Sequence, residues 1–403
     1  MSLETLINIV STESDESAED VLIYLIQILD EFGTNSFNDD DVKNEISTVG
    51  ILLCEKLHSE GYLHVSFQYS CNNLDEETES LSYKCKYCEG VLHESMNEHE
   101  VTRIYKFSRE SYNAILEFNF IMKKNRYFIP ELYRNYDNLI NEIDNVVPFL
   151  GSGISMPFNL PNWEGLLRRL EDFLPEEFHK KYYNELVTEG SYFEAFDLLM
   201  DKSMNVSNED QLKEEIVQII SQAHMDIADD EHNMLDLIKL NSHYYISTNY
   251  DLIFEHFLAN ENGYNTPVCM DEIGNLRNIS TTGNRVIHLH GHINRKSSMV
   301  VTKKDYSKLY NRKGILVQLA AILGNKSLLF IGFSFKDKFF TDIYDTLVNI
   351  LKTHHYIVLF NPNLQEIREL NKKNIRVIGL KVDNDDYIDA ISTLINFIVR
   401  KVN

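Results

Sequence analysis

The sequence predicts an α/β protein in which a doubly wound, Rossmann-like parallel sheet with a helical insertion follows a smaller α+β domain. From Val146 onward, short β-branched or aromatic runs alternate with segments of helical periodicity, the pattern typical of parallel strands joined by crossover helices. Residues 1–144 instead combine helical segments with one strand of strict polar and apolar alternation. We therefore expect an acidic N-terminal domain at residues 1–144 and a sheet domain at residues 145–403.

Length and composition agree with two folded domains. The chain has 403 residues, of which 43% are hydrophobic and 25% are charged, so collagen-like and wholly disordered structures are excluded. A net charge of −24 would repel nucleic-acid phosphates and anionic lipid, which argues against direct binding to either. Residues 1–100 hold 22 acidic and 4 basic residues, so the first quarter of the chain presents a distinct surface.

The termini and the cysteines predict a cytoplasmic protein. The first residues lack the basic and apolar regions of a secretory signal, and no stretch reaches the ~18 apolar residues of a membrane helix. Five cysteines are too few, and odd in number, for a disulfide framework in a chain of this length.

The N-terminal domain begins with helical patterns near Asp20–Glu31 and Asp41–Glu60. Alternating side chains predict a half-buried strand at Leu63–Ser70, an acidic turn at Asn72–Ser80 leads to a second strand at Leu81–Tyr87, and a further strand is expected at Val101–Ser108 before a helix at Ser111–Met122. Helices followed by a hairpin are compatible with a winged-helix-like module. The strongly acidic composition argues against a DNA-reading surface there.

The C-terminal domain shows six strand patterns, at Val146–Leu150, Tyr244–Ser247, Val286–His290, Ser327–Gly332, Tyr356–Phe360 and Arg376–Gly379. An amphipathic helix is expected at Tyr250–Ala259. The long interval Trp163–Leu240 is mostly helical by pattern, so we interpret it as a helical insertion that covers the sheet. Such sheets bind ligands at the carboxyl ends of their strands.

A glycine loop ends the first of these strands. The segment V-V-P-F-L-G-S-G-I-S places Gly151, Ser152, Gly153 and Ser155 after a strand and shortly before a helix. Glycines at a strand end let backbone amides approach a pyrophosphate, and a helix N-terminus adds a favourable partial charge. The motif is weak alone, because glycine pairs also form tight turns for steric reasons.

Four further strand ends supply polar groups: S-T-N-Y-D at 247–251, H-L-H-G at 288–291, G-F-S-F at 332–335 and F-N-P-N at 360–363. An asparagine and an aspartate at one strand end, a histidine at another and a Gly-x-Ser at a third predict a site assembled from several loops.

In these motifs, residues 145–400 resemble the sirtuin-like (silent-information-regulator-like) domain, particularly its bacterial branch of NAD hydrolases in anti-phage defence. G-S-G-I-S resembles the family's phosphate loop, T-N-Y-D its T-x-N-x-D segment, H-G its catalytic histidine motif and G-F-S its ribose and phosphate contact. The four motifs agree with the family in order and spacing.

The resemblance implies roles for single residues. Asn249 would position the nicotinamide ribose and a water, and His290 would be the general base. The residues that would bind NAD are Gly151, Ser152, Gly153, Ser155, Asp251, Gly332, Ser334 and Asn361. Cleavage of the nicotinamide–ribose bond needs little beyond a positioned water, a polarising base and a pocket for the leaving group, so no metal is expected at the site.

Several of these side chains have an alternative interpretation. Asp251 could equally cap the helix that follows it. His288 and His290 are two apart on a predicted strand and should face the same side, and the position before Gly291 favours His290 as the base. We expect His288 and His292 to be hydrogen-bonded neighbours or surface histidines, and Trp163 to be a packing anchor.

Sirtuin deacylases also carry a zinc module with two Cys-x-x-Cys pairs after the histidine motif. No cysteine follows His290 here, which makes water the expected acceptor and deacylation a minor alternative. The one Cys-x-x-Cys pair, Cys85 and Cys88, lies in the N-terminal domain, with Cys71, His93 and His99 close enough in sequence to complete a zinc site. A lone pair is a weak signal against chance cysteines.

The predicted function is therefore hydrolysis of NAD to nicotinamide and ADP-ribose by an NAD-depleting effector of anti-phage defence. The resemblance implies a homo-oligomer and an activator, either a partner ATPase or a phage-derived trigger, with residues 1–144 in regulation or assembly. The alternatives are an NAD or ADP-ribose sensor without turnover and a nucleic-acid adaptor. The sequence leaves the trigger and a cyclic ADP-ribose product open.

Overall fold

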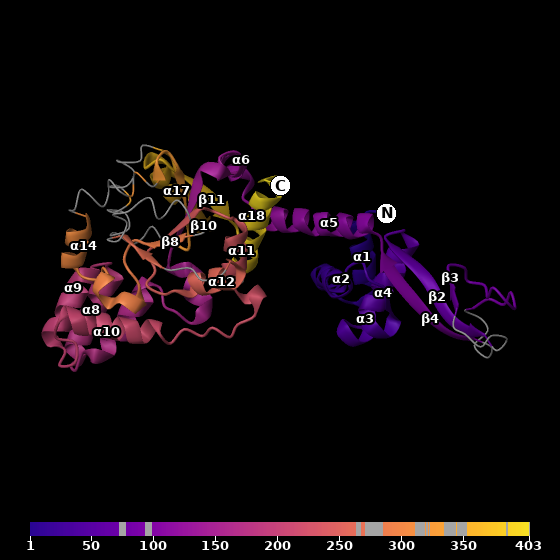
Figure 1. Cartoon of the computed structure of the whole chain (residues 1–403), viewed down its shortest axis with the longest axis horizontal. Helices are drawn as coiled ribbons and strands as arrows, with labels where there is room; N and C mark the ends of the chain where they lie inside the picture. The colour runs from indigo at the N-terminus through magenta and orange to yellow at the C-terminus, as the bar shows by residue number, and fades with distance from the viewer. Residues whose placement is uncertain are drawn as a thin grey trace. The chain divides into compact units, whose positions relative to one another are not determined.

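The computed structural model describes residues 1–71, 78–92, 99–262, 267–270, 285–310, 319, 321, 323–333, 344, 353–383 and 386–402. The chain divides into two compact units, Met1–Asn125 and Arg126–Asn403 (Figure 1). Residues 126–144 therefore belong to the second unit. No helix in the described part of the chain is long and apolar enough to cross a membrane.

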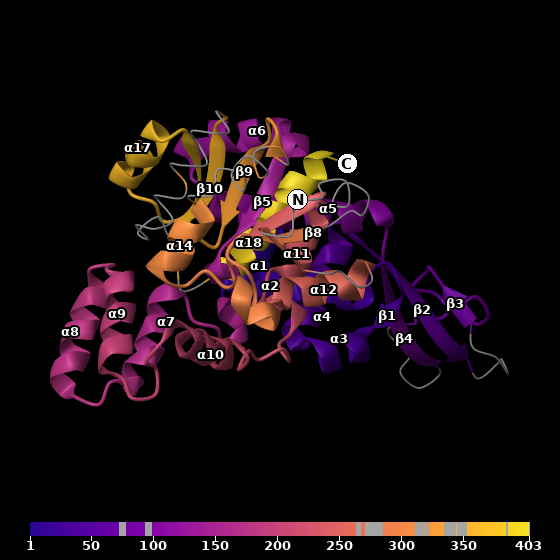
Figure 2. The same ribbon diagram turned by 60° about the vertical axis from the view of Figure 1, so that its left-hand side comes forward.

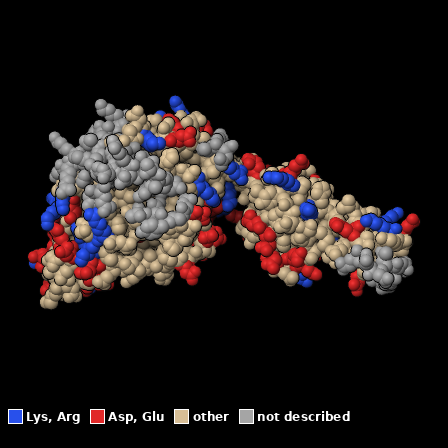
Figure 3. Space-filling view, viewed as in Figure 1, with Lys and Arg blue, Asp and Glu red and all other residues tan. Residues whose placement is uncertain are grey.

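The N-terminal unit combines helices with a four-stranded antiparallel sheet of order β1-β4-β2-β3. Its elements are α1 (Leu3–Ser14), α2 (Ala18–Phe32), β1 (Phe37–Asn38), α3 (Asp39–Glu45), α4 (Thr48–Ser59), β2 (Leu63–Cys71), β3 (Thr78–Ser80), β4 (His99–Phe107) and α5 (Arg109–Tyr127), the last of which crosses the division between the units. One apolar face of each of α1, α2 and α4 packs into a common core with the start of β2 and the end of β4. Acidic side chains are spread over the visible face of this unit (Figure 3).

Two predictions for this unit are wrong. The helix expected at Asp41–Glu60 is two helices, because Ser47 leaves the helical conformation and its side chain accepts the backbone N–H of Gly50 as the N-cap of α4. Leu81–Tyr87 is not a strand. The amide of Cys85 donates to Gly90 O at 2.8 Å and closes a tight turn there. The short strand β3, which precedes this segment, is the one that pairs with β2 on the side away from β4.

The C-terminal unit is built on a seven-stranded, fully parallel sheet of order β11-β10-β9-β5-β6-β8-β7, which confirms the predicted fold class. The strands are β5 (Val146–Leu150), β6 (Tyr244–Ser247), β7 (Val268–Cys269), β8 (Arg285–His288), β9 (Ser327–Ile331), β10 (His355–Phe360) and β11 (Ile375–Leu380). Every residue of β5 and β9 is buried, as expected for strands covered on both faces. The strand order reverses at β5, where such sheets bind ligands.

Helices and 3-10 turns fill the connections of this unit. They are η1 (Pro130–Leu132), α6 (Tyr133–Asn141), η2 (Ile143–Asn145), η3 (Ser152–Phe158), α7 (Trp163–Leu170), η4 (Glu171–Phe173), α8 (Glu177–Thr188), α9 (Tyr192–Lys202), α10 (Glu209–Ile220), η5 (Asp229–Glu231), α11 (Met234–Lys239), α12 (Ile253–Asn262), η7 (Ile293–Ser298), α14 (Lys303–Tyr310), α17 (Leu364–Lys372) and α18 (Tyr387–Val402). The predicted helical insertion lies between β5 and β6, and its helices α7 to α10 gather beside one another (Figure 2).

Residues 128–136, which precede β5 in the sequence, contact the edge strand β11 and the helix α18. The ring of Phe128 stacks on that of Tyr136 with centroids 4.4 Å apart and meets that of Phe397 edge-on at 5.1 Å. The side chain of Asn135 donates to Val377 O at 2.9 Å, and the hydroxyl of Tyr136 donates to Gly379 O. These contacts explain why the second unit begins at Arg126.

Candidate active site at the carboxyl edge of the sheet

A cavity of about 230 Å³ lies at the carboxyl ends of the adjacent strands β9, β5, β6 and β8. Its volume is near the lower limit of small-molecule sites, roughly 300 Å³. Six of the predicted site residues line it: Ser152, Ser155, Asn249, Asp251, His290 and Gly332. Four motifs far apart in the sequence thus meet because their strands are neighbours in the sheet.

The two glycine loops pack directly against each other. The amide of Gly151 donates to Ile331 O at 2.9 Å, and the amide of Gly153 donates to Gly332 O at 3.0 Å. A Cβ on Gly151 would lie 2.5 Å from Gly332 O, and Gly332 itself has a φ of +76°. These glycines are therefore required by the close approach of the loops after β5 and β9. Neither Gly151 nor Gly153 is among the residues that line the cavity.

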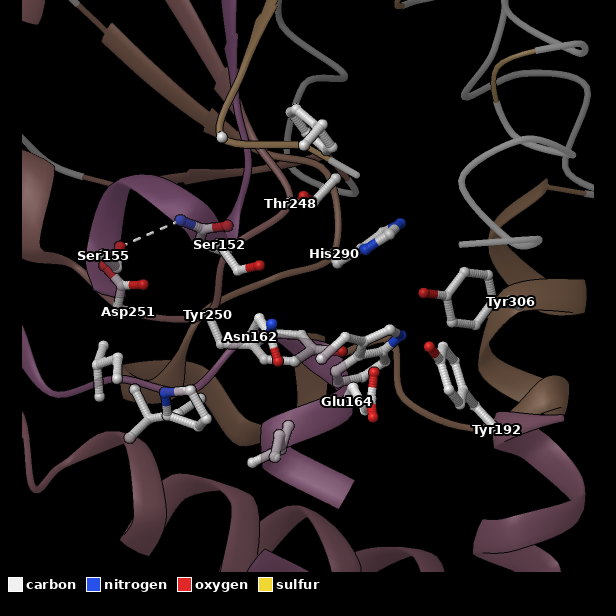
Figure 4. Close-up of a pocket in the computed structure, with 18 residues that line it drawn as sticks. Ser152, Ser155, Asn162, Glu164, Tyr192, Thr248, Tyr250, Asp251, His290 and Tyr306 are labelled. Carbon is white, nitrogen blue, oxygen red and sulfur yellow. Dashed lines mark hydrogen bonds between the residues drawn. The ribbon is translucent and has the colours of Figure 1, made fainter. Parts of the chain in front are cut away.

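Asn249 is buried and held by the loop after β5. Its side-chain amide donates to Gly151 O at 3.0 Å and to Ser155 Oγ at 3.3 Å, the bond drawn at Ser155 in Figure 4. Its backbone amide donates to Ser247 Oγ at 3.0 Å. Because the amide nitrogen of the side chain is bonded to the protein, the carbonyl oxygen Oδ1 is the group that Asn249 can offer to a ligand.

Asp251 both caps a helix and lines the cavity. Its carboxylate accepts the amide of Ile253 at 3.2 Å, at the start of α12, so the capping role expected as an alternative is present. Burial raises the pKa of Asp251 to about 6, and nearby Glu255 adds to the increase, while the bonds from the amide of Ile253 and the hydroxyl of Ser155 oppose it. The carboxylate is therefore mostly ionised at neutral pH and becomes protonated just below it.

His288 and His290 do not share a face, contrary to the expectation. The strand β8 ends at His288, and the chain then turns at Gly291, whose φ is +74°. His288 points into the protein, where Nδ1 lies 3.0 Å from Asn249 O and Nε2 bonds to the buried carboxylate of Glu255. Burial alone would lower the pKa of His288, but the charge and hydrogen bond of Glu255 raise it overall. As expected, His288 is thus a hydrogen-bonded neighbour, and it supports the loop that carries Asn249.

His290 lines the cavity and reaches toward Tyr306 of α14 (Figure 4), with ring centroids 5.1 Å apart. Only 6% of its surface is exposed, and burial lowers the pKa of His290 to about 3. The imidazole is therefore neutral across the physiological pH range. A neutral imidazole offers one nitrogen acceptor and one N–H donor to a ligand.

The helical insertion supplies the opposite wall, which the sequence did not identify. Trp163 of α7 lines the cavity. So do Glu164 of α7, Tyr192 of α9 and Tyr306 of α14, which Figure 4 labels. Trp163 also packs on Phe196 and Tyr250, each at 6.0 Å, so it is a packing anchor that borders the site as well. Trp163, which follows the glycine loop in the sequence, was the one residue of this wall that the sequence analysis singled out.

A buried ion pair joins this wall to α14. Lys213 Nζ of α10 lies 2.8 Å from a carboxylate oxygen of Asp305, and both side chains are largely buried. Burial would raise the pKa of Asp305, but the bond from Lys213 and the backbone amides of Thr302 and Val301 lower it overall. The carboxylate therefore stays ionised and fixes the start of the helix that presents Tyr306.

One predicted binding residue, Asn361, lies away from the cavity. The side chain of Asn361 donates to Val382 O at 2.7 Å and accepts from the Val382 amide at 3.0 Å, so it joins the end of β10 to the segment after β11 and does not line the cavity. Ser334 lies outside the described residues. The group of metal-ligating side chains found in the described residues lies in the N-terminal unit, not at this cavity.

Residues 243–378 match the family model of the SIR2-like domain, which confirms the predicted sirtuin-like resemblance in the C-terminal part of the chain. The match includes the segments of Asn249 and His290 and begins after the first glycine loop. The chain is similar to NAD(+) hydrolase ThsA of Bacillus cereus (strain MSX-D12), with 28% identity over 200 residues, which are 48% of this chain and 38% of that protein.

Two further relatives share that name. The protein of Enterococcus faecium is 25% identical over 253 residues, 62% of this chain and 47% of that protein. The protein of Acinetobacter baumannii (strain 532279) is 26% identical over 209 residues, 50% and 39% of the two chains. This chain therefore spans less than half the length of the curated relatives it matches. A solved cytosolic 5′-nucleotidase IIIB bound to cytidine aligns over 68% of this chain and 92% of its own, at 12% identity and a TM-score of 0.30, which carries no argument.

Proposed function

Because the chain carries a SIR2-like domain in its C-terminal part, we propose that it hydrolyses NAD to nicotinamide and ADP-ribose. The observation that supports this most is the meeting of Asn249, Asp251 and His290 at one cavity on the carboxyl edge of the sheet. The names of the three relatives, all NAD(+) hydrolases, point to the same reaction.

Each side chain has a task in that reaction. Bond cleavage releases neutral nicotinamide and leaves positive charge on the ribose carbon, which water then attacks. The ionised carboxylate of Asp251 stabilises that positive charge, and Asn249 Oδ1 orients the attacking water. The neutral ring of His290 accepts a hydrogen bond from a ribose hydroxyl or from the water, whose proton finally passes to solvent.

The binding of the dinucleotide follows from the rest of the cavity. Ser152 and Ser155 of the loop after β5 and Gly332 of the loop after β9 line the cavity, and we propose that they contact the phosphates and the ribose of NAD. We retain Gly151, Gly153, Ser334 and Asn361 as proposed contributors to NAD binding, with the two glycines acting by shaping the loop. The aromatic wall of Trp163, Tyr192 and Tyr306 would limit water access to the reacting bond.

The setting of this activity is also part of the proposal. We place the chain in the cytoplasm as an NAD-depleting effector of anti-phage defence that acts by abortive infection. Uncontrolled NAD loss harms the host, so the compact, acidic N-terminal unit is proposed to restrain or assemble the catalytic unit. A homo-oligomer, a partner ATPase or a phage-derived activator would provide the control.

A sensor that binds NAD or ADP-ribose without turnover is the second candidate. One observation favours it: burial lowers the pKa of His290 to about 3, which makes the imidazole a weak base. Protein deacylation is a weaker alternative.

Substitution of Asn249 tests hydrolysis against sensing. We expect Asn249→Ala to lower NAD turnover by about 10²-fold or more, because positioned proton-transfer and orienting groups contribute about that much. His256→Ala, an exposed position on α12, is the matched control and should keep the wild-type rate. Two results together would favour the sensor. Calorimetry would show tight binding of NAD, and NAD would remain intact after hours of incubation with the protein and an extract from infected cells.

A further inference from the structure

Four metal-ligating side chains meet at the tip of the N-terminal sheet. The Sγ atoms of Cys71, Cys85 and Cys88 and a ring nitrogen of His99 all lie within 4.8 Å of one another. Cys88 Sγ is 3.3 Å from His99 Nε2. Zinc bound tetrahedrally at about 2.3 Å from sulfur and 2.0 Å from nitrogen separates its ligand atoms by roughly 3.5–3.8 Å, so this cluster needs little adjustment to enclose the ion.

Strand register brings two of the ligands together. Cys71 ends β2 and His99 begins β4, and the two residues are directly paired across the antiparallel ladder. Side chains of directly opposite residues share one face of the sheet and lie about 5 Å apart at Cβ. The positions of these ligands are therefore fixed by the nine-residue pairing of β2 with β4.

A tight turn presents the other two ligands. The amide of Cys85 donates to Gly90 O at 2.8 Å, the amide of Glu89 donates to Cys85 O at 3.2 Å, and Lys84 pairs with Val91. Glu89 has a φ of +57°, and a Cβ on Gly90 would lie 3.3 Å from Cys88 Sγ. The turn thus folds both sulfur atoms toward the same point and leaves them room.

The surroundings of the sulfur atoms suit thiolates. The amide of Tyr87 donates to Cys85 Sγ at 3.4 Å. Such N–H donors around a metal-bound sulfur offset its negative charge and hold its orientation. The amide of Lys86 is used to bind the turn to the sheet, since it donates to the hydroxyl of Tyr69 at 2.9 Å.

Among its described residues, this tip has few apolar contacts of its own. Its buried cluster consists of Phe67, Tyr69, Cys71, Cys85 and Leu92, separate from the main core of the unit. Leu81, in the same loop, is 83% exposed. Small substructures with so little core are commonly held by a metal or a disulfide. All three cysteines here are free, and the fourth member of the cluster is a histidine, which favours a metal.

We propose that Cys71, Cys85, Cys88 and His99 bind one Zn²⁺ ion that fastens the loop around residues 78–92 to the strands β2 and β4. Three sulfur ligands and one nitrogen ligand select zinc over calcium or magnesium. Four protein ligands leave no open position, so the ion is structural. The sequence indicated Cys85 and Cys88 and offered three residues to complete the site; the structure brings in two of them, and the third, His93, lies outside the described residues.

Elemental analysis of the full-length chain, purified without chelator, tests the proposal. We expect about one zinc per chain in the wild type and in Cys54→Ala, which removes a buried thiol of the same unit outside the cluster. Cys88→Ala and His99→Ala should lose the ion, whereas His99→Cys should retain it because four thiolates also bind zinc. A wild-type chain that carries no zinc and binds none when zinc is added would overturn the proposal, as would full retention of zinc by both alanine variants.

A second measurement does not depend on the folding of any variant. Thiols of the native wild-type chain are alkylated before and after treatment with a chelator and then counted by mass spectrometry. We expect Cys71, Cys85 and Cys88 to become reactive only after chelation, with no change at Cys269 in the other unit. Equal reactivity of the partly exposed Cys88 before and after chelation would contradict zinc binding.

Discussion

Burial favours the neutral forms of both Asp251 and His290, which line the same cavity, but the two side chains change charge at different pH values. The pKa of Asp251 is raised to about 6 and that of His290 is lowered to about 3, so between these values neither side chain carries a full charge. Above pH 6 Asp251 is ionised while His290 stays neutral. The proposed reaction, which develops positive charge on the ribose, therefore has its negative partner only on the alkaline side of pH 6.

The pH profile of NAD cleavage should show this difference. We expect kcat/KM to fall tenfold per pH unit below about pH 6 as Asp251 becomes protonated, with no further limb near the ordinary histidine pKa. Asp251→Asn should abolish the acid limb together with most of the activity. An acid limb that persists unchanged in Asp251→Asn would assign it to another group.

The same substitution predicts a change in stability. When the pKa of a carboxyl is higher in the folded than in the unfolded chain, its contribution to the stability of the folded protein is lost as the pH rises between the two pKa values. For Asp251 this interval runs from about 3.8 to about 6. Asp251→Asn should therefore raise the melting temperature at pH 7 by about 2 °C or more and have no such effect near pH 4. A lower melting temperature at pH 7 would show that the helix-capping bond to Ile253 matters more.

Among the elements, the turn after β8 decides which histidine reaches the cavity. The alternation of side chains in a strand predicted a common face for His288 and His290, but the strand ends at His288 and Gly291 adopts a φ of +74°. A Cβ at Gly291 would lie 2.3 Å from Ser298 O. This glycine is thus required both by its backbone conformation and by the close approach of η7.

A pair of glycine substitutions separates these two requirements. Gly190 has the same φ of +74°, but a Cβ there would meet nothing within 4 Å. We expect Gly190→Ala to cost about 1 kcal/mol from backbone strain and to leave NAD turnover unchanged. Gly291→Ala should lower the melting temperature by several degrees more and remove turnover, because the displaced turn carries His290. Equal behaviour of the two variants, measured by thermal unfolding and NAD loss, would contradict this role.

Much of the sheet could be predicted from the sequence because its strands are continuous apolar runs. Val146–Leu150 and Tyr244–Ser247 were predicted to the residue. β7 was missed because two residues at a sheet edge give no periodicity. α1 was also missed, although Leu3, Leu6, Ile7 and Val10 have the spacing of one helical face. Local pattern likewise could not show the break of the helix at Ser47 or the turn that replaces the strand at Leu81–Tyr87.

The candidate site was predictable where it depends on strand ends and not where it depends on distant helices. Asn249, Asp251 and His290 follow buried strands whose carboxyl ends meet in any such sheet. Glu255, Tyr192 and Tyr306 come from helices whose orientation is set by long-range packing, such as the Lys213 to Asp305 ion pair. Asn361 follows a strand end as well, but its side chain is used to bind Val382.

Over the whole molecule, the chain forms two compact units, Met1–Asn125 and Arg126–Asn403. The N-terminal unit has its own main core and a second small cluster at the proposed zinc site. The C-terminal unit includes residues 126–144, and Phe128 and Tyr136 of this segment pack beside the edge strand β11. The described residues that line the cavity belong to the C-terminal unit. We therefore propose that the chemistry belongs to the C-terminal unit and that the N-terminal unit controls it.

The most direct test of this account is the fate of NAD with the full-length chain. Purified wild type and His290→Ala are incubated with NAD, and nicotinamide and ADP-ribose are quantified by chromatography, with His243→Ala, a histidine that does not line the cavity, as the control. We expect wild type and control to release nicotinamide and ADP-ribose at the same rate, and His290→Ala to release both about 10²-fold or more slowly. If His290→Ala turned over NAD at the wild-type rate, the assignment of the site would be contradicted. If the wild type left NAD intact even when extract from infected cells was added, the proposed reaction itself would be contradicted.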